Sequence, residues 1–135
     1  MKAAVRYYSK TGNTKKLAEA IASAIGVTAM GVDQPLDEDV DILFLCNSVY
    51  WAGVDGKVKT FMKASGGKIG KLVNVSTAAM IESTYRQIKS LAAEAGIPID
   101  EREFHCRGSF TAMHKGKPDQ NDIESVKKFA REIIS

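Results

Sequence analysis

The chain has 135 residues, a length that suits one domain with a hydrophobic core of its own, and no linker or internal repeat divides it. Hydrophobic residues make up 44% of it without forming a run long enough to cross a membrane, and the chain starts directly with a strand-like segment, so we expect a cytoplasmic protein without a membrane span. The net charge of +3 is spread over both halves of the sequence, which gives no indication of nucleic-acid binding.

The first predicted strand and the first predicted helix are joined by a loop rich in hydroxyl groups. Residues 3–8 suit a strand, and Leu17, Ile21 and Ile25 recur at helical spacing after the loop. Such a junction presents unpaired backbone N–H groups at the positive end of the helix dipole, Gly12 lets the backbone approach an anion, and hydroxyl groups donate to phosphate oxygens. The pattern therefore predicts a phosphate site, with a hydroxyl-capped turn that needs no ligand as the alternative. The candidate residues are Ser9, Lys10, Thr11, Gly12, Asn13 and Thr14.

The remaining predicted elements alternate between strands and helices. Apolar or alternating runs predict strands at residues 27–31, 41–46, 71–76 and 99–106, of which the first and the last resemble edge strands. Helical spacing predicts helices over residues 58–62, 81–95 and 119–133, with Gly26, Asp55 and Gly96 at helix ends. This alternation predicts an α/β fold with a doubly wound parallel sheet and right-handed crossovers.

The order of residues in the first loop carries a family resemblance. Ser-x-Thr-Gly-x-Thr directly after a first strand resembles the FMN phosphate loop of the flavodoxin family, whereas the GxxxxGK[ST] and GxGxxG patterns of other phosphate-binding loops are absent around residue 12. The resemblance covers nearly the whole chain and implies a single-domain, flavodoxin-like sheet of five strands in the order 2-1-3-4-5. It also implies FMN as the cofactor, bound where the loops after the first and third strands meet. The mildly positive charge differs from the acidic surface that electron-carrying flavodoxins tend to show.

Two further loops are expected to flank the flavin ring. After the third strand, Tyr50 or Trp51 would stack on the ring, and Gly53 would let a backbone amide turn toward the flavin N5, as the resemblance implies; the alternative places both aromatic side chains in the core. After the fourth strand, small residues stand where flavodoxins usually offer a second aromatic, which leaves one ring face open to a quinone or nicotinamide. The candidates in these loops are Asn47, Ser48, Tyr50, Trp51, Ala52, Gly53, Ser76, Thr77, Ala78 and Ala79.

The resemblance assigns the redox chemistry to the flavin, so no catalytic side chain is required. We expect electron transfer to a redox partner protein or a small-molecule acceptor. The alternatives are an FMN-dependent NAD(P)H:quinone-type oxidoreductase and a non-redox binding module that has lost productive FMN binding. His105-Cys106 starts like a cysteine phosphatase signature, but Ala112 stands where its Arg is required, and Cys46-Asn47 stands where a response regulator needs Asp. Both cysteines lack metal or redox spacing and are expected to be buried thiols.

Overall fold

The computed structural model describes residues 1–10, 12–48, 54–78, 83–107 and 116–135. Its strands are β1 (Ala3–Tyr7), β2 (Ala29–Gly31), β3 (Val40–Ser48), β4 (Ile69–Thr77) and β5 (Ile99–Cys106). Its helices are α1 (Asn13–Ile25), α2 (Gly56–Ser65), α3 (Tyr85–Ala95) and α4 (Gln120–Ile134). The alternation of strands and helices is therefore as predicted.

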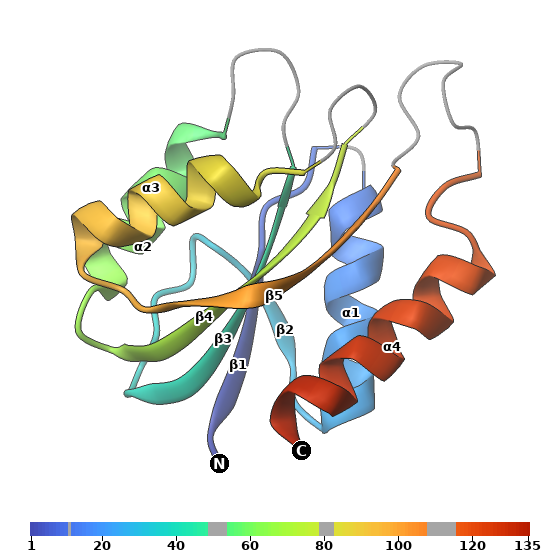
Figure 1. Ribbon diagram of the computed structural model, residues 1–135, viewed down its shortest axis with the longest axis horizontal. Coiled ribbons are helices and arrows are strands. Elements are labelled where there is room, and N and C mark those ends of the chain that lie inside the picture. Colours follow the sequence, from blue (N-terminus) through green and yellow to red (C-terminus); the bar gives the residue numbers. More distant parts are fainter. Residues whose placement is uncertain (11, 49–53, 79–82, 108–115) are drawn as a thin grey trace.

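The five strands form one parallel sheet in the order β2-β1-β3-β4-β5, which confirms the expected strand order. The short β2 and the half-exposed β5 are the two edges, as their sequences indicated. Because all strands run in the same direction, their carboxyl ends lie together at one end of the strands, which we call the carboxyl edge of the sheet (Figure 1). The connections after β1 and β3 leave the carboxyl edge toward opposite faces of the sheet. Ligands bind in such folds at the point where two neighbouring connections diverge in this way.

Helices cover both faces of the sheet, with α1 and α4 on one face and α2 and α3 on the other (Figure 1). Alternate side chains of the central strands point into the two resulting hydrophobic layers, as expected for strands buried on both faces. The layer under α1 and α4 includes Val5, Leu17, Ile21, Phe44 and Val75. The layer under α2 and α3 includes Leu43, Leu45, Val58, Leu72 and Ile88.

Local capping signals fix the helix ends that the sequence predicted. Gly26 and Gly96 end α1 and α3 in the left-handed conformation, with φ of 78° and 73°, which glycine adopts without a steric penalty. At the other ends, the Asp55 side chain caps α2, and Asp119 forms a capping box at the start of α4. These short-range interactions explain why the helix ends were predictable.

The central strands are longer than predicted, and this moves three candidate residues, Asn47, Ser48 and Thr77, out of loops. Asn47 and Ser48 belong to β3 and pair with Ser76 and Thr77 of β4, so the loops begin later than the sequence indicated. Polar side chains at a strand end look like loop residues in sequence, whereas the neighbouring strand supplies the backbone partners that extend the ladder. Tyr8 lies just beyond β1 rather than in it.

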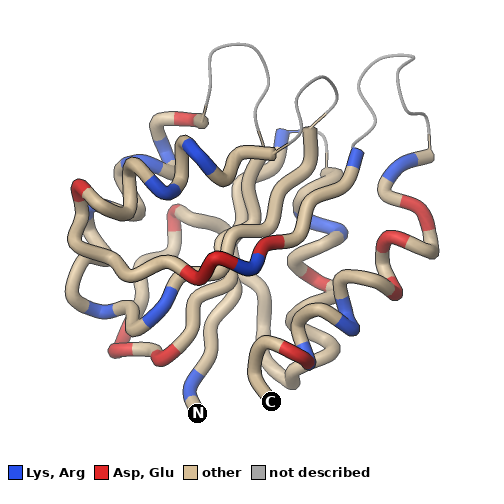
Figure 2. Tube along the Cα trace, in the orientation of Figure 1, with Lys and Arg blue, Asp and Glu red and all other residues tan. Residues whose placement is uncertain are grey.

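Charged side chains are distributed unevenly along the direction of the strands. Near the amino ends of the strands, the Lys2 Nζ lies 2.7 Å from a Glu38 carboxylate oxygen, and Asp100 pairs with Arg102 at 2.9 Å and with Lys71 at 3.3 Å. The acidic residues 37–39 before β3 lie at this same edge, whereas many basic residues lie toward the carboxyl edge, together with the helix-capping Asp55 and Asp119 (Figure 2). None of the helices in the described ranges is both long and apolar enough to cross a membrane.

Candidate functional site

The loop after β1 turns tightly at the carboxyl edge of the sheet. The Tyr8 N–H donates to the Cys46 carbonyl oxygen of β3 (3.0 Å), which holds the start of the loop against the neighbouring strand. Farther along, the Gly12 N–H donates to the Ser9 hydroxyl oxygen (2.9 Å). The Ser9 side chain therefore supports the turn from within, in part as the capping alternative expected, and its hydroxyl hydrogen is left to donate elsewhere.

Gly12 opens the loop toward a ligand. It is the N-cap of α1 with a φ of 88°, and a Cβ built on it would meet no atom within 4 Å among the described residues beyond its chain neighbours. The first N–H groups of a helix have no intrahelical partner, and Gly12 has no side chain with which to cap them. By contrast, the start of α2 is capped by a side chain: the Lys57 N–H donates to the Asp55 carboxylate (2.8 Å). The start of α1 thus combines open space, N–H donors and the positive end of the helix dipole, which suits an anion.

Three buried hydroxyl groups lie beside this helix start, on the face of the sheet that α1 covers. The Thr14 and Thr77 hydroxyl oxygens lie 3.0 Å apart and join α1 to the end of β4. Ser48 pairs in register with Thr77, and its hydroxyl has no hydrogen-bond partner among the described residues. Since the threonine pair uses one of its two hydroxyl hydrogens, one O–H donor remains there as well.

A second polar cluster lies at the ends of β3 and β4, on the face that α2 and α3 cover. The Asn47 Nδ2 group lies 2.8 Å from the Asn74 Oδ1 atom and 3.1 Å from the Leu45 carbonyl oxygen. The Asn74 Nδ2 group donates to the Thr84 hydroxyl at the N-cap of α3 (3.1 Å). All three polar side chains are fully buried, yet the Asn47 Oδ1 atom has no partner in the described part of the chain. Buried polar atoms are usually paired, so this acceptor is notable.

Asn74 and Thr84 did not figure among the candidates from sequence. The available signal was a carboxamide at an inward position of a strand that is otherwise apolar from residue 72 to residue 75. The structure shows why it stands there: it links the end of β3 to the start of α3 through side-chain hydrogen bonds.

The structure brings most of the described candidates to one edge. Asn13 is buried in the first turn of α1, whereas Lys10 is exposed in the loop. Ser76 is buried at the end of β4, and the Ala78 N–H just after it donates to the Cys106 carbonyl oxygen (3.2 Å). The candidates that lie outside the described residues are Thr11, Tyr50, Trp51, Ala52, Gly53 and Ala79.

The two thiols are not suited to nucleophilic or redox chemistry. Cys46 is buried as expected, and burial raises the pKa of its thiol far above the ordinary value. Cys106 is only partly buried, because it lies on an edge strand, but burial still raises its pKa to about 12. Both groups therefore stay protonated near neutral pH. Within the described ranges, no group of His, Cys, Asp and Glu side chains is arranged to hold a metal ion.

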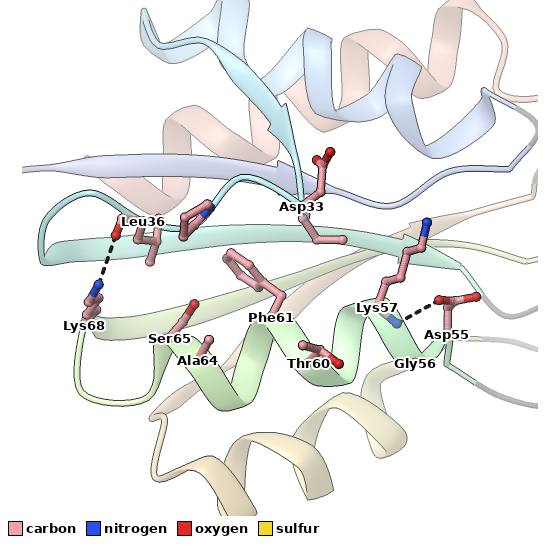
Figure 3. A pocket seen from close by; sticks show the side chains of 12 residues that line it. Asp33, Leu36, Asp55, Gly56, Lys57, Thr60, Phe61, Ala64, Ser65 and Lys68 are labelled. Atoms are coloured by element: carbon pink, nitrogen blue, oxygen red, sulfur yellow. Dashed lines mark hydrogen bonds between the residues drawn. The ribbon is translucent and has the colours of Figure 1, made fainter.

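A pocket of about 720 Å³ flanks the candidate site between α2 and the segment that connects β2 to β3 (Figure 3). Leu36 and Phe61 give it apolar walls, and at one end the Lys68 Nζ donates to the Leu36 carbonyl oxygen (3.1 Å). At the other end, the Lys57 Nζ lies 5.9 Å from the centre of the Tyr8 ring, directly before the hydroxyl-rich loop. The pocket thus runs along α2, and none of the candidate cofactor-binding residues lines it.

A helix start that is suited to an anion, at the strand-order switch of a parallel sheet, is the arrangement found in doubly wound α/β proteins. No protein-family model matches the sequence, and no curated protein sequence matches it significantly. Solved structures do resemble it. A flavodoxin from the domain Archaea has a TM-score of 0.77 at 21% identity, covering 98% of this chain and 96% of its own. A short-chain flavodoxin associated with a bacterial microcompartment has a TM-score of 0.73 at 20% identity, covering 99% and 97% of the two chains.

The same fold also matches part of a larger protein. The rubredoxin oxygen:oxidoreductase of the anaerobe Desulfovibrio gigas has a TM-score of 0.75 at 13% identity over 96% of this chain, which corresponds to 34% of that protein. These likenesses show that the chain has the flavodoxin-like fold.

Proposed function

We propose that this protein binds FMN at the carboxyl edge of its sheet and acts as a flavodoxin-like electron-transfer protein. The observation that carries the proposal is the start of α1, where Gly12 has a φ of 88° and a Cβ would project into open space. That geometry lets a phosphate group approach the backbone at the positive end of a helix. FMN supplies one-electron and two-electron redox chemistry when it is bound, and the protein supplies binding, orientation and electrostatics.

The donors around this position fit a phosphate monoester. Ser9 and the Thr14–Thr77 pair each keep a hydroxyl hydrogen, and the first-turn N–H groups of α1 add backbone donors. Hydrogen bonds to a charged oxygen are stronger than those between neutral groups, so several such donors stabilise a bound dianion. Thr11 completes the proposed loop.

The ends of β3 and β4 fit the polar edge of an isoalloxazine ring. Such a ring carries both N–H and carbonyl groups, and the buried Asn47 Oδ1 and Ser48 hydroxyl have no partners among the described residues. We assign these two residues, with Ser76, to the protein groups that contact the ring. Tyr50 or Trp51 would cover one ring face, and residues 52, 53, 78 and 79 would complete the binding loops.

Titration of the folded protein with FMN tests this proposal. We expect saturable binding with a perturbed flavin absorbance band, followed by reversible reduction of the bound flavin. Riboflavin lacks the phosphate and should bind much more weakly. A folded protein that gives no absorbance change at high micromolar FMN would refute the proposed function and favour a non-redox binding module.

A second candidate function is the reduction of a small acceptor such as a quinone by NAD(P)H. The small side chains at the end of β4, Ser76, Thr77 and Ala78, favour it, because none of them is an aromatic group that could cover the second face of the proposed ring. Stopped-flow mixing of the FMN-loaded protein with NADPH separates the two functions. Rapid flavin reduction by NADPH indicates an enzyme, whereas a flavin that is reduced only by a redox protein indicates a carrier.

A further inference from the structure

The helices that begin at the carboxyl edge have an unusual charge pattern. In α1, α2 and α3 the first turn contains no acidic residue. It contains basic residues in their place, and all of these are exposed: Lys15, Lys16, Lys57, Lys59 and Arg86. Positive side chains at a helix N-terminus are disfavoured by the helix dipole, which prefers Asp or Glu there. The pattern therefore works against helix stability in α1 and α3, whereas in α2 the Asp55 carboxylate at the N-cap offsets it in part.

The start of α4 and the last turn of α2 follow the ordinary preference. Helix α4 has Asp122 in its first turn and Arg131 in its last turn, and α2 has Lys63 in its last turn. Lys117, just before α4, pairs with the Asp119 carboxylate at 2.9 Å. Basic first turns without an acidic residue thus occur in α1, α2 and α3, but not in α4, which also begins on the carboxyl side of the sheet.

The five basic residues are not neutralised locally. None of them forms an ion pair with any residue in the described ranges, as is also true of exposed lysines elsewhere, such as Lys63, Lys89 and Lys128. Two of the five have their amines near aromatic rings instead: the Lys15 Nζ lies 6.0 Å from the centre of the Tyr7 ring, and Lys57 lies similarly over Tyr8. Such contacts keep the charge.

The fold gathers these charges into one surface, although they are spread through the sequence. We name the five residues of these first turns the basic rim. Since α1 lies on one face of the sheet and α2 and α3 on the other, the basic rim has members on both sides of the carboxyl edge (Figures 1 and 2), where Asp55 and Asp122 are acidic neighbours. The positive helix ends add to the same potential. A surface spread over both layers is broader than one small anion can cover, and it matches the scale of a protein partner.

We propose that the basic rim is the docking surface for an acidic one-electron redox protein, an inference that rests on the proposed function. A partner whose negative surface surrounds its redox centre would be oriented with that centre toward the flavin. In each encounter, one electron leaves the reduced partner and enters the flavin. Full reduction of one flavin therefore takes two partner molecules, and the accompanying protons come from solvent.

The test uses the FMN-loaded protein and a plant-type [2Fe–2S] ferredoxin of strongly negative charge as the probe. Stopped-flow absorbance follows flavin reduction by reduced ferredoxin. We expect the second-order rate constant to fall on the order of tenfold between about 20 and about 300 mM salt, because salt screens the attraction between exposed charges. As a comparison, oxidation of the reduced flavin by ferricyanide, which is a small anion, is measured under the same conditions.

A pair of charge-reversal variants locates the effect. Lys57→Glu/Lys59→Glu changes the basic rim on α2, and Lys127→Glu/Lys128→Glu makes the same change in net charge in the middle of α4. The first variant should lower the ferredoxin rate constant at low salt on the order of tenfold, and the control should change it much less. Because Glu at the start of α2 suits the helix dipole, the first variant should also melt no lower than the wild type.

The possible outcomes separate the two proposals. A protein that takes up no FMN refutes the proposed function before any mixing, and the docking proposal with it. A yellow protein whose reduction by ferredoxin is insensitive to salt, or is slowed equally by both variants, refutes the docking proposal alone. The docking proposal is also refuted if the Lys57→Glu/Lys59→Glu variant strongly slows flavin oxidation by ferricyanide but leaves flavin reduction by ferredoxin unchanged. That result would indicate a small anionic substrate instead.

Discussion

Replacing Gly12 with Ala separates phosphate binding from folding. Gly12 has a φ of 88°, and an L-residue in this left-handed region costs about 1–2 kcal/mol of stability. The new Cβ meets no protein atom within 4 Å, so the fold should tolerate it. It projects into the space where we place the phosphate, however, and the displaced phosphate loses charge-assisted hydrogen bonds worth roughly 1.5–3 kcal/mol each. We therefore expect FMN affinity to fall at least about tenfold.

The chain offers a matched control at the other end of the same helix. Gly26 has a φ of 78°, and a Cβ built on it also meets no atom within 4 Å. Gly26→Ala should lower the melting temperature about as much as Gly12→Ala without changing FMN affinity. Calorimetric titrations with FMN and riboflavin measure the difference, and riboflavin binding should be little affected by either substitution. Equal FMN affinities for the two variants, or an equal loss of riboflavin binding, would refute the placement of the phosphate at Gly12.

Three further predictions concern the hydroxyl pair, the amino edge and the aromatic loop. Thr14→Val should destabilise the protein by about 1 kcal/mol and should weaken FMN binding more than riboflavin binding. A double-mutant cycle with Thr77→Val, measured by urea unfolding, should show that the two substitutions are coupled; additive effects on stability would contradict the 3.0 Å hydrogen bond. The hydrogen bond from the Arg102 guanidinium lowers the pKa of Asp100 from 3.8 to about 2, so the carboxylate stabilises the fold by at most about 2.5 kcal/mol at neutral pH, and this contribution should disappear as the pH falls from about 4 to about 2. In urea unfolding, wild type and Asp100→Asn should therefore converge in stability in acid; a constant difference would contradict the assignment. The emission of Trp51, the chain's one Trp, should be strongly quenched when FMN binds, and unchanged emission at saturation would return this side chain to the core alternative.

The parts of the fold that the sequence predicted well depend on local physics. Gly26 and Gly96 end helices in a left-handed conformation, and Asp55 and Asp119 begin helices with side-chain caps, so a few adjacent residues carry the signal. Continuous apolar runs likewise predicted the buried central strands and their place in the sheet.

The features that sequence reasoning missed depend on contacts between distant residues. Ser48 and Thr77 were placed in loops, because only the pairing of β3 with β4 reveals that the strands continue through them. The role of Asn74 depends on its side-chain hydrogen bonds with Asn47 and Thr84, which are 27 and 10 residues away in the sequence. The basic rim was invisible for the same reason: its charges are scattered in sequence, and only the parallel sheet brings the three helix starts to one edge.

The most direct test of the central claim is an amide NMR titration of the apoprotein with FMN, compared with riboflavin. If the phosphate binds at the start of α1, the largest FMN-specific shifts should fall on the amides of Gly12, Asn13 and Thr14. Shifts common to both ligands should then appear at the ends of β3 and β4. FMN-specific shifts centred on the α2 pocket around Phe61 and Lys68, with residues 12–14 unmoved, would contradict the account.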